Sequence, residues 1–596
     1  MRLAIIFLLV TNACCFENHS TADEKKIPVS LASSDFSDTE WWGRQQSTAT
    51  TIDFDTILQT QSYIFLSNGP NPLVSEIALQ CEAAHQLVLD FVHPYPTPHL
   101  QVISYFLYSS FEEKGMARHN TARAEIDFEK QEVHVIANES LHGEEMQAEN
   151  ALLIRQLLNK PVFTILEEGL QVYFAPHWQG KGFRYWAGRL YQSGNFPTLA
   201  DLCDAERMQN ESPLIRTCGA AVLVDFLLST WGKEHFLHNY HLWAPTGEEI
   251  SNWQQSWNEF LEKSLTNQGK GLIITSSPPA YMKGFNFAHE GYRVYNGYGG
   301  NKANASLTTM KDLGANATAI IPYTFMRNPQ EPAAFPIPKN AGSENDECVI
   351  QALAYAHNLG MYTLLKPQIW VRRGWTGDIH MNTEADWNLF FDEYYRWIRH
   401  YALLGEMYHV NGLCIGVELT QTTLGHEKQW RSIIQKIRGL YNGQLTYAAN
   451  WGEEFENIGF WDQLDFIGLN CYYPLSQNDH PTDLELKAGI DQVLSRAKKV
   501  QERFNKPLVF TEIGFRSVTA PWKNPHEEVQ GRAASEEDQM RCYETVFEAL
   551  SQWKAQKGIF WWKWPSDLDY LEGKSTEYAP YHKLAEHSVK EWFGKQ

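Results

Sequence analysis

The chain has 596 residues, of which 43% are hydrophobic, so it is long enough for several domains and has the composition of a soluble globular protein. Its formal net charge is −21 and no basic run is present, which argues against nucleic acid as a partner, because phosphate binding needs clustered Lys and Arg. Of the nine cysteines two lie in the signal-like region and the other seven are scattered without a CxxC pair, so neither a disulfide scaffold nor a structural zinc site is expected.

Residues 1–14 have the pattern of a secretory signal. Arg2 is followed by an apolar run at residues 3–10, which is too short to span a membrane permanently. The sequence Thr-Asn-Ala-Cys at residues 11–14 resembles the cleavage box of bacterial lipoproteins, in which Cys14 is lipidated and attaches the protein to a membrane. Ordinary signal cleavage nearby stays an equal alternative. Both predict an extracytoplasmic protein, secreted or lipid-anchored at the cell envelope, with the polar residues 15–40 as a tether.

Residues 41–265 predict one mixed α+β domain. Hydrophobic periodicity predicts strands at residues 60–67, 101–108 and 131–137, and helices at residues 74–93, 149–158, 162–174, 213–231 and 253–265. Residues 266–280 are rich in Gly, Ser and Pro and are predicted to be a linker.

Two stretches of this domain, residues 165–174 and 218–227, resemble the thermolysin-like gluzincin metallopeptidases. In that family a Glu-Gly pair, here Glu168 and Gly169, supplies the third zinc ligand, and an HExxH motif supplies the other two. The corresponding stretch here keeps Glu149 but has no histidine, and HExxH occurs nowhere in the chain. Catalytic zinc then has too few ligands, so the resemblance implies an inactive accessory domain without metal. A peptidase or cell-wall-associated protein that acts through this domain is the alternative.

From residue 281 to residue 596 strands and helices alternate. The predicted strands lie at residues 283–288, 317–323, 361–367, 412–418, 445–450, 465–470, 508–512 and 558–564. Eight such units predict a (β/α)8 TIM barrel, so the whole chain is expected to be an α/β protein in which a peptidase-like α+β domain precedes the barrel. A doubly wound open sheet is the competing fold, but no glycine-rich phosphate loop follows the first strand.

The active site of such a barrel lies at the carboxyl-terminal ends of its strands. Polar or aromatic side chains stand at or just after these ends, namely Asn286, His289, Lys366, Glu418, Asn450, Tyr472, Glu512 and Trp562. Glu418 and Glu512 end two apolar strands that are three βα units apart, and a buried carboxylate is costly without a role. Two such carboxylates suggest the catalytic pair of a glycosidase.

The C-terminal half also resembles Glycoside Hydrolase Family 113, the β-1,4-mannanases of the large retaining clan. The stretches that carry this resemblance are residues 284–287, 365–367, 416–419, 446–451, 460–475, 511–517 and 560–564. The resemblance implies Glu418 as acid/base, Glu512 as nucleophile, a polysaccharide or oligosaccharide substrate and no cofactor. Most of the clan has Asn before the acid/base, where it touches the sugar 2-hydroxyl. Because this chain has Val417 there, that contact must come from another residue.

Aromatic side chains complete the predicted site. Either Tyr472 or Tyr473 could orient Glu512. The period of two along the last strand places Trp562 and Trp564 on one face, and one of them is expected to be a sugar platform. Trp375 in the third loop is predicted to be a further sugar contact or, equally, a loop anchor. The sequence thus predicts an exported endo-β-1,4-mannanase or a related β-glycan hydrolase, with a non-catalytic glycan-binding lipoprotein as the alternative.

Overall fold

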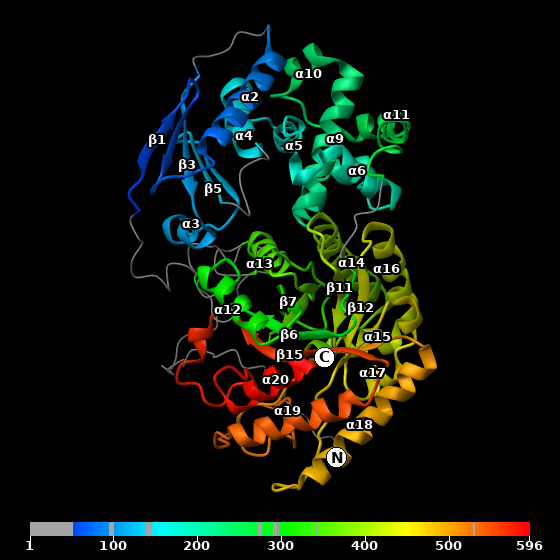
Figure 1. Cartoon of the computed structure of the whole chain (residues 1–596). Helices are drawn as coiled ribbons and strands as arrows, with labels where there is room; N and C mark the ends of the chain where they lie inside the picture. Colours follow the sequence, from blue (N-terminus) through cyan, green and yellow to red (C-terminus); the bar gives the residue numbers. More distant parts are fainter. Residues whose placement is uncertain are drawn as a thin grey trace, which may run out of the picture.

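The computed structural model describes residues 52–94, 100–138, 146–270, 277–289, 295, 297–339, 344–372, 374–527 and 531–595. Figure 1 shows two regions along the chain, an N-terminal α+β region in blue through cyan to bluish green and a barrel in green to red. The signal-like residues 1–14 with Cys14, and the predicted tether at residues 15–40, lie outside the described residues.

The N-terminal region contains a five-stranded sheet with the order β1-β2-β3-β5-β4. Its strands are β1 (Asp55–Gln59), β2 (Tyr63–Ser67), β3 (Ile103–Tyr108), β4 (Ala124–Asp127) and β5 (Glu132–Ile136). The three inner strands are parallel, and β1 and β4 pair antiparallel at the two edges. The sequence analysis did not predict β1 and β4, because edge strands with half-exposed polar residues carry little apolar signal.

Helices cover the sheet and form most of the rest of this region. They are α2 (Val74–Val92), α3 (Phe111–Arg118), α4 (Gln147–Leu158), α5 (Ile165–Tyr173), α6 (Phe183–Gln192), α7 (Leu199–Cys203), α8 (Ala205–Gln209), α9 (Pro213–Trp231), α10 (Lys233–Asn239) and α11 (Gly247–Leu265). By length and composition α9 could cross a membrane, with a hydropathy of 1.4, but 61% of the apolar window is buried inside the protein. It packs against α5 and α6, so it is the core helix of this region.

The C-terminal region is a closed parallel barrel with the strand order β11-β12-β13-β14-β15-β6-β7-β9. The strands are β6 (Met282–Ala288), β7 (Ala317–Ile320), β9 (Tyr362–Leu365), β11 (Gly412–Val417), β12 (Gln444–Asn450), β13 (Ile467–Asn470), β14 (Leu508–Ile513) and β15 (Gln556–Pro565). Nearly every strand residue is buried, as expected where helices cover the outside and side chains fill the inside. The predicted (β/α)8 barrel is confirmed, and the open doubly wound sheet is excluded.

Helices surround the barrel in the expected order (Figure 1). The long ones are α12 (Asn301–Asp312), α13 (Asp346–Asn358), α14 (Glu384–Met407), α16 (Glu427–Leu440), α18 (Asp483–Phe504), α19 (Glu536–Ser551) and α20 (Leu584–Lys595), and the short ones are α15 (Thr420–Gly425) and α17 (Glu453–Asn457). Side-chain caps start several of them, because the first backbone N–H groups of a helix lack partners within it.

A small parallel sheet extends two of the barrel strands. Strand β8 (Tyr323–Met326) follows β7, and strand β10 (Gln368–Val371) follows β9. Pro322 and Pro367 separate each pair, and proline has no N–H to continue a ladder. The predicted strands at residues 317–323 and 361–367 are therefore interrupted, and β10 lies beyond the carboxyl-terminal end of the barrel.

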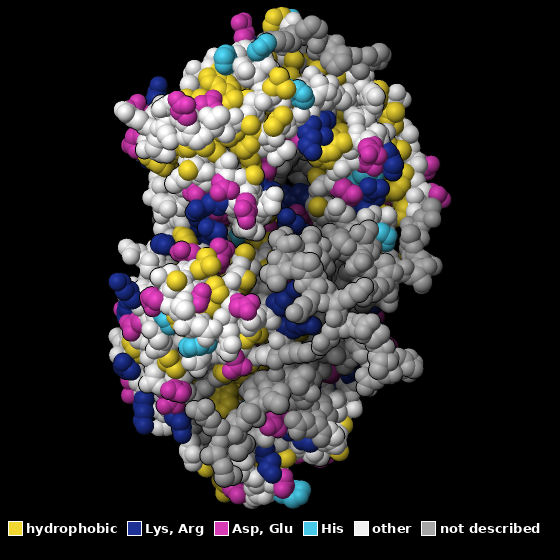
Figure 2. Space-filling view, turned by 180° about the vertical axis from the view of Figure 1, so that it is seen from behind, with side chains coloured by type: hydrophobic (Ala, Val, Ile, Leu, Met, Phe, Trp, Pro, Cys, Tyr) yellow, Lys and Arg dark blue, Asp and Glu magenta, His cyan; other side chains and the backbone are white. Residues whose placement is uncertain are grey.

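The two regions meet along α12, α13, α14 and α16. Arg189 donates to Glu406 at 2.6 Å, and Arg399 donates to both oxygens of Glu211 at 2.7 Å. Between them, the buried His400 lies within 2.9 Å of Ser212 in the N-terminal region. Figure 2 shows acidic and basic side chains close together near this junction, on the face seen from behind.

Candidate active site

Glu418 follows directly on β11 in an uncommon backbone conformation. Its φ is 52°, in the left-handed region that residues other than glycine rarely adopt, and its N–H donates to Ala448 O at 2.9 Å. The preceding backbone is tightly packed, since a Cβ on Gly416 would lie 2.6 Å from the ring of Tyr447. A strained residue that its surroundings hold in place is typical of functional positions.

Two side chains donate hydrogen bonds to the Glu418 carboxyl group. Trp375 Nε1 lies 2.9 Å from Oε2, and Asn470 Nδ2 lies 2.9 Å from Oε1. The amide oxygen of Asn470 accepts from Thr511 Oγ1 at 2.9 Å, which fixes the direction of the amide. Burial, followed by the negative charge of Glu512, raises the pKa of Glu418 to about 7, although both hydrogen bonds act in the opposite direction. A carboxyl group of this pKa can both donate and accept a proton near neutrality.

Glu512 lies in β14 and is contacted by three hydrogen-bond donors. Lys366 Nζ is 2.6 Å and Gln368 Nε2 is 3.2 Å from Oε1, while Tyr472 OH is 2.9 Å from Oε2. The Lys366 side chain is completely buried, so its ammonium group and the carboxylate form an ion pair shielded from solvent. All three contacts suit a negatively charged carboxylate, which accepts but does not donate.

The two carboxyl groups therefore have different surroundings. Glu418 receives hydrogen bonds from an indole and an amide, both neutral, whereas Glu512 has a cation in direct contact. Such a difference between neighbouring carboxyl groups assigns the proton donor and the ionised group. The arrangement can donate a proton from Glu418 and present a negative oxygen from Glu512.

Several predicted site residues lie beside this pair. Lys366 and Tyr472 contact Glu512, and Trp375 contacts Glu418. Asn286 is fully buried, and its Nδ2 donates to Thr511 O at 3.0 Å and to Phe560 O at 3.3 Å. Its amide group thus ties β6 to β14 and β15 next to Glu512.

The two consecutive tyrosines have separate partners. Tyr472 is the one that contacts Glu512, whereas Tyr473 OH accepts from Gly452 N at 2.8 Å and lies 3.3 Å from Glu456. The Tyr473 ring also packs edge-on against Trp451. The structure therefore selects Tyr472 as the residue that orients Glu512.

Asn450 and His289 are held at strand ends by other contacts. Asn450 is the half-buried last residue of β12, and its backbone N–H donates to Glu454 at 2.6 Å. His289 follows β6, and its Nδ1 lies 3.2 Å from a Glu344 oxygen. None of the hydrogen bonds or ion pairs among the described residues joins His289 to Glu418 or Glu512.

The expectation that Trp562 and Trp564 share a face is wrong. The pairing of β15 with β6 shifts between Trp561 and Trp564, so the period of two does not continue through this stretch. Trp564 is fully buried, and its Nε1 donates to Ser306 on α12, which places it behind the barrel wall. Trp562 is half-buried, and its ring lies 5.7 Å from Lys366 Nζ, so it is the tryptophan on the side of the carboxyl pair.

Three polar residues near the carboxyl pair, Asn470, Gln368 and Glu454, were not predicted from the sequence. Asn470 is the last residue of its strand, so the rule that selected Glu418 would also have found it. Gln368 was hidden because Pro367 suggested the end of the strand. Glu454 lies on the short helix α17, where burial raises its pKa to about 7 and Tyr447 and Thr423 donate to it.

The glutamates of the N-terminal region are in contact with other side chains. Glu149 is 2% exposed and accepts hydrogen bonds from Tyr105 OH and Cys81 Sγ. Glu168 accepts from Arg216 at 3.0 Å and also from Thr217. Within the described ranges, no group of three or more His, Cys, Asp or Glu side chains could hold a metal ion. The resemblance of this region to peptidases stays a prediction.

The comparisons with known proteins concern the barrel. The model of Glycoside Hydrolase Family 113 matches residues 285–583. A solved GH113 β-1,4-mannanase is 24% identical, over 53% of this chain and 100% of that chain, with a TM-score of 0.48. The GH113 β-mannanase AaManA from Alicyclobacillus acidocaldarius is 28% identical, over 53% of this chain and 98% of that chain, with a TM-score of 0.47. A β-glucuronidase from an uncultured Clostridium sp. is 15% identical, over 55% of this chain and 53% of that chain, with a TM-score of 0.38. No curated protein matches the chain.

Proposed function

Because this chain belongs to Glycoside Hydrolase Family 113, we propose that it hydrolyses β-1,4-mannan or a closely related β-glycan by double displacement with retention of configuration. The observation that carries the proposal is the carboxyl pair, with Glu418 at the end of β11 and Glu512 on β14, in the surroundings described above. Glu418 is the acid/base and Glu512 is the nucleophile.

In the first step Glu512 attacks the anomeric carbon, and the bond from that carbon to the leaving oxygen breaks. The Glu418 carboxyl group donates its proton to the leaving oxygen, so the departing glycan is a neutral alcohol. The pKa of Glu418, raised to about 7, keeps the proton available up to neutral pH. Tyr472 and Lys366 hold the Glu512 carboxylate in one position before it reacts.

In the second step Glu418 is a carboxylate and takes a proton from water as the water attacks the glycosyl–enzyme ester. The ester bond to Glu512 breaks, and the sugar leaves with its original configuration. Formation of the ester removes the negative charge of Glu512, which favours ionised Glu418 at this stage, since that charge is one cause of its raised pKa.

Substrate contacts are proposed from the same side of the barrel. Trp562 and Trp375 present aromatic surface beside the two glutamates, which suits the apolar face of a sugar ring. The side chain of Val417 cannot donate a hydrogen bond, and Gln368 carries the amide donor next to Glu512. We assign the contact with the sugar 2-hydroxyl to Gln368.

The proposal includes the location of the protein. The signal-like residues 1–14 support export, and the lipobox-like residues around Cys14 support attachment to a membrane through a lipid. Both follow from sequence alone. Labelling with a radioactive fatty acid, compared between the natural chain and Cys14→Ser, separates lipidation from ordinary signal cleavage.

The function is tested with a panel of soluble β-glycans and a reducing-end assay. We expect activity on β-1,4-mannan or glucomannan, and a large loss of it in both Glu418→Ala and Glu512→Ala on these polymers. Binding to mannan without release of reducing ends at any pH between 4 and 9 would instead favour the glycan-binding alternative.

A further inference from the structure

The N-terminal region touches the barrel at two places where loops of the carboxyl-terminal end return to helices. Each βα loop of a barrel runs from the end of a strand to the start of the next helix, and these loops build the active-site end. The first loop runs from β6 to α12, and the second runs from β8 to α13. The start of each helix is in contact with a side chain of the N-terminal region.

The start of α13 depends on Thr121. Asn345 is the N-cap residue of α13, and its Oδ1 accepts from Cys348 N at 2.9 Å. This contact directs its Nδ2 outwards, where it donates to Thr121 Oγ1 at 2.7 Å. Both side chains are buried, so water cannot replace the hydrogen bond when the hydroxyl group is removed.

The start of α12 depends on Glu112 and Phe111. Gly300 precedes α12 and has no side chain to cap it, and the carboxylate of Glu112 accepts from Asn301 N at 2.7 Å instead. The backbone approaches closely here, because a Cβ on Gly299 would lie 3.2 Å from Cβ of Phe111 and 2.8 Å from Cys348 Sγ. A carboxylate from outside the barrel thus supplies the missing cap.

The described ends of the two loops also lie close to each other. His289, the first residue after β6, lies 3.2 Å from Glu344, which directly precedes Asn345. Asn345 thus directly follows a side chain that lies near His289, a predicted sugar contact. The same second loop begins at β8, which pairs with β10, and β10 carries Gln368 against Glu512.

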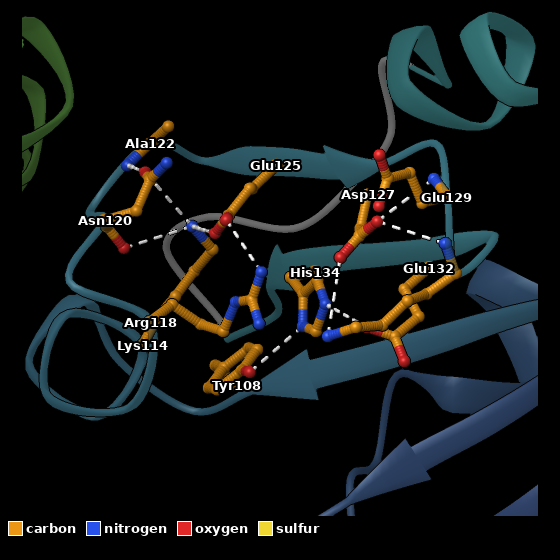
Figure 3. Close-up of polar contacts among 11 residues, drawn as sticks. Tyr108, Lys114, Arg118, Asn120, Ala122, Glu125, Asp127, Glu129, Glu132 and His134 are labelled. Atoms are coloured by element: carbon orange, nitrogen blue, oxygen red, sulfur yellow. Dashed lines mark hydrogen bonds and ion pairs between the residues drawn. The ribbon is translucent and has the colours of Figure 1, made fainter. Parts of the chain in front are cut away.

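One short segment of the N-terminal region makes the contacts to the starts of α12 and α13, and its own contacts hold it in position. Figure 3 shows the Lys114 ammonium group directed at Asn120 and Glu125, with Arg118 on the other oxygen of Glu125. Lys114 Nζ donates to both oxygens of Asn120, and Ala122 N donates to the same Asn120 side chain at 2.7 Å. The turn that presents Thr121 is thereby fixed on both sides.

We propose that residues 111–123, hereafter the clamp segment, position the starts of α12 and α13, where the first two βα loops of the barrel end, and so determine how tightly the enzyme holds an extended glycan. Thr121, Glu112 and Lys114 are positioning residues, since they act through Asn345, Asn301 and Asn120. The N-terminal region is then part of the glycan-binding unit rather than a separate module. This inference rests on the proposed glycoside hydrolase function.

The test uses the full chain and four variants. Thr121→Val removes the hydroxyl group at nearly constant volume, and Thr121→Ser restores it. Tyr395→Phe is the matched control, because it also removes one hydroxyl bond across the interface, to Asn195, far along the chain from the clamp segment. Glu112→Ala is a second clamp variant at a half-buried position, and its hydrogen bond to Asn301 is exposed to solvent.

With mannohexaose as substrate, we expect Thr121→Val to raise KM about fivefold, with kcat nearly unchanged. A change of this size in a binding constant corresponds to the loss of one buried neutral hydrogen bond. Glu112→Ala should raise KM less, and Thr121→Ser and Tyr395→Phe should match the natural chain. An unchanged KM in both clamp variants would overturn the inference, and so would an equal rise in Tyr395→Phe.

Hydrogen exchange separates failure of this inference from failure of the proposed function. Without any substrate, the backbone amides of Cys348 and Val349 should exchange their hydrogens faster in Thr121→Val than in the natural chain. In Tyr395→Phe the exchange rates of these amides should be unchanged. If the natural chain hydrolyses no glycan, the proposed function fails, but the exchange rates still show whether the clamp segment positions the start of α13. Unchanged exchange at the start of α13 in Thr121→Val would contradict the clamp directly.

Discussion

Glu149 and Glu168 of the N-terminal region can be set beside Glu418 and Glu512 of the barrel, because each region brings two glutamates into a partly or fully buried setting. Burial raises the pKa of both Glu149 and Glu418. Glu149, however, accepts from Tyr105 and Cys81, whereas Glu418 has a second carboxylate as a neighbour whose charge raises its pKa further. A perturbed carboxyl group thus marks a site only when its partner has a complementary role.

The second members of the two pairs differ in the same way. Glu168 is part of a half-exposed ion pair with Arg216, which resembles many structural ion pairs. Glu512 has a completely buried lysine and two further donors that hold it at the end of the barrel. The comparison predicts that substitutions of the barrel glutamates abolish activity, whereas substitutions in the N-terminal region leave the chemistry intact.

The largest effect is expected from removal of the nucleophile. Glu512→Ala should lower kcat on mannan by roughly 10⁴-fold or more, because the nucleophile acts as one unit with the acid/base. Glu168→Ala is the matched change in the other region and should keep kcat. Azide should restore turnover of an aryl β-mannoside by Glu512→Ala with an inverted product, as measured by NMR. Full hydrolysis by Glu512→Ala would show that the nucleophile is another residue.

Removal of the proton donor should have an effect that depends on the leaving group. Glu418→Ala should lower kcat/KM on mannan by about 10²–10⁴-fold, and much less on a nitrophenyl β-mannoside, whose leaving group needs little protonation. Azide should then give a β-mannosyl azide of retained configuration. An equal loss on both substrates would assign Glu418 to a role other than proton transfer.

The pH dependence follows from the raised pKa of Glu418. Its protonated form is needed in the first step, so kcat/KM should fall as the pH rises through about 7. The folded pKa lies above the unfolded value near 4.5, so the stability that Glu418 contributes is complete below pH 4.5 and is lost as the pH rises to about 7. Glu418→Gln lacks this titration. Denaturant unfolding of the natural chain and of this variant at pH 4.5 and 8 should therefore show that the difference between their free energies of unfolding changes by an amount on the order of 3 kcal/mol. A difference that does not change with pH would contradict the assigned pKa.

The smallest effect is expected for the buried glutamate of the N-terminal region. Burial raises the pKa of Glu149, and Gln keeps an oxygen that accepts from Tyr105. Glu149→Gln should leave kcat and KM unchanged and should leave the free energy of unfolding at pH 8 equal or slightly higher, because no buried charge remains. Loss of activity in this variant, with an unchanged melting temperature, would indicate that the region has chemistry of its own.

The barrel and its two glutamates were predictable because their signals are local. A buried parallel strand is a continuous apolar run, and a polar residue at its end is visible without knowledge of the contacts. Glu418, Glu512, Lys366 and Tyr472 were found in this way. The same reasoning assumed regular strands, so it failed for Trp564, where the register shifts, and for Gln368, where a proline interrupts the strand.

Contacts between distant parts of the chain were not predictable. Thr121 and Asn345 are more than two hundred positions apart, and neither has a sequence context that suggests a partner. The capping of α12 by Glu112 has the same origin, since the glycine before α12 indicates only that the helix has no cap of its own. Such pairings follow from how the two regions pack, which a single sequence does not specify.

The most direct test of the central claim is to trap the glycosyl–enzyme intermediate. A 2-deoxy-2-fluoro-β-mannosyl fluoride reacts in the first step and hydrolyses slowly in the second, so the sugar should accumulate on the nucleophile. Mass spectrometry of a protease digest should then find one added fluoromannosyl group on the peptide that contains Glu512, and none in Glu512→Gln. A label on the peptide that contains Glu418, or no label while mannan is still hydrolysed, would contradict the assignment of the pair.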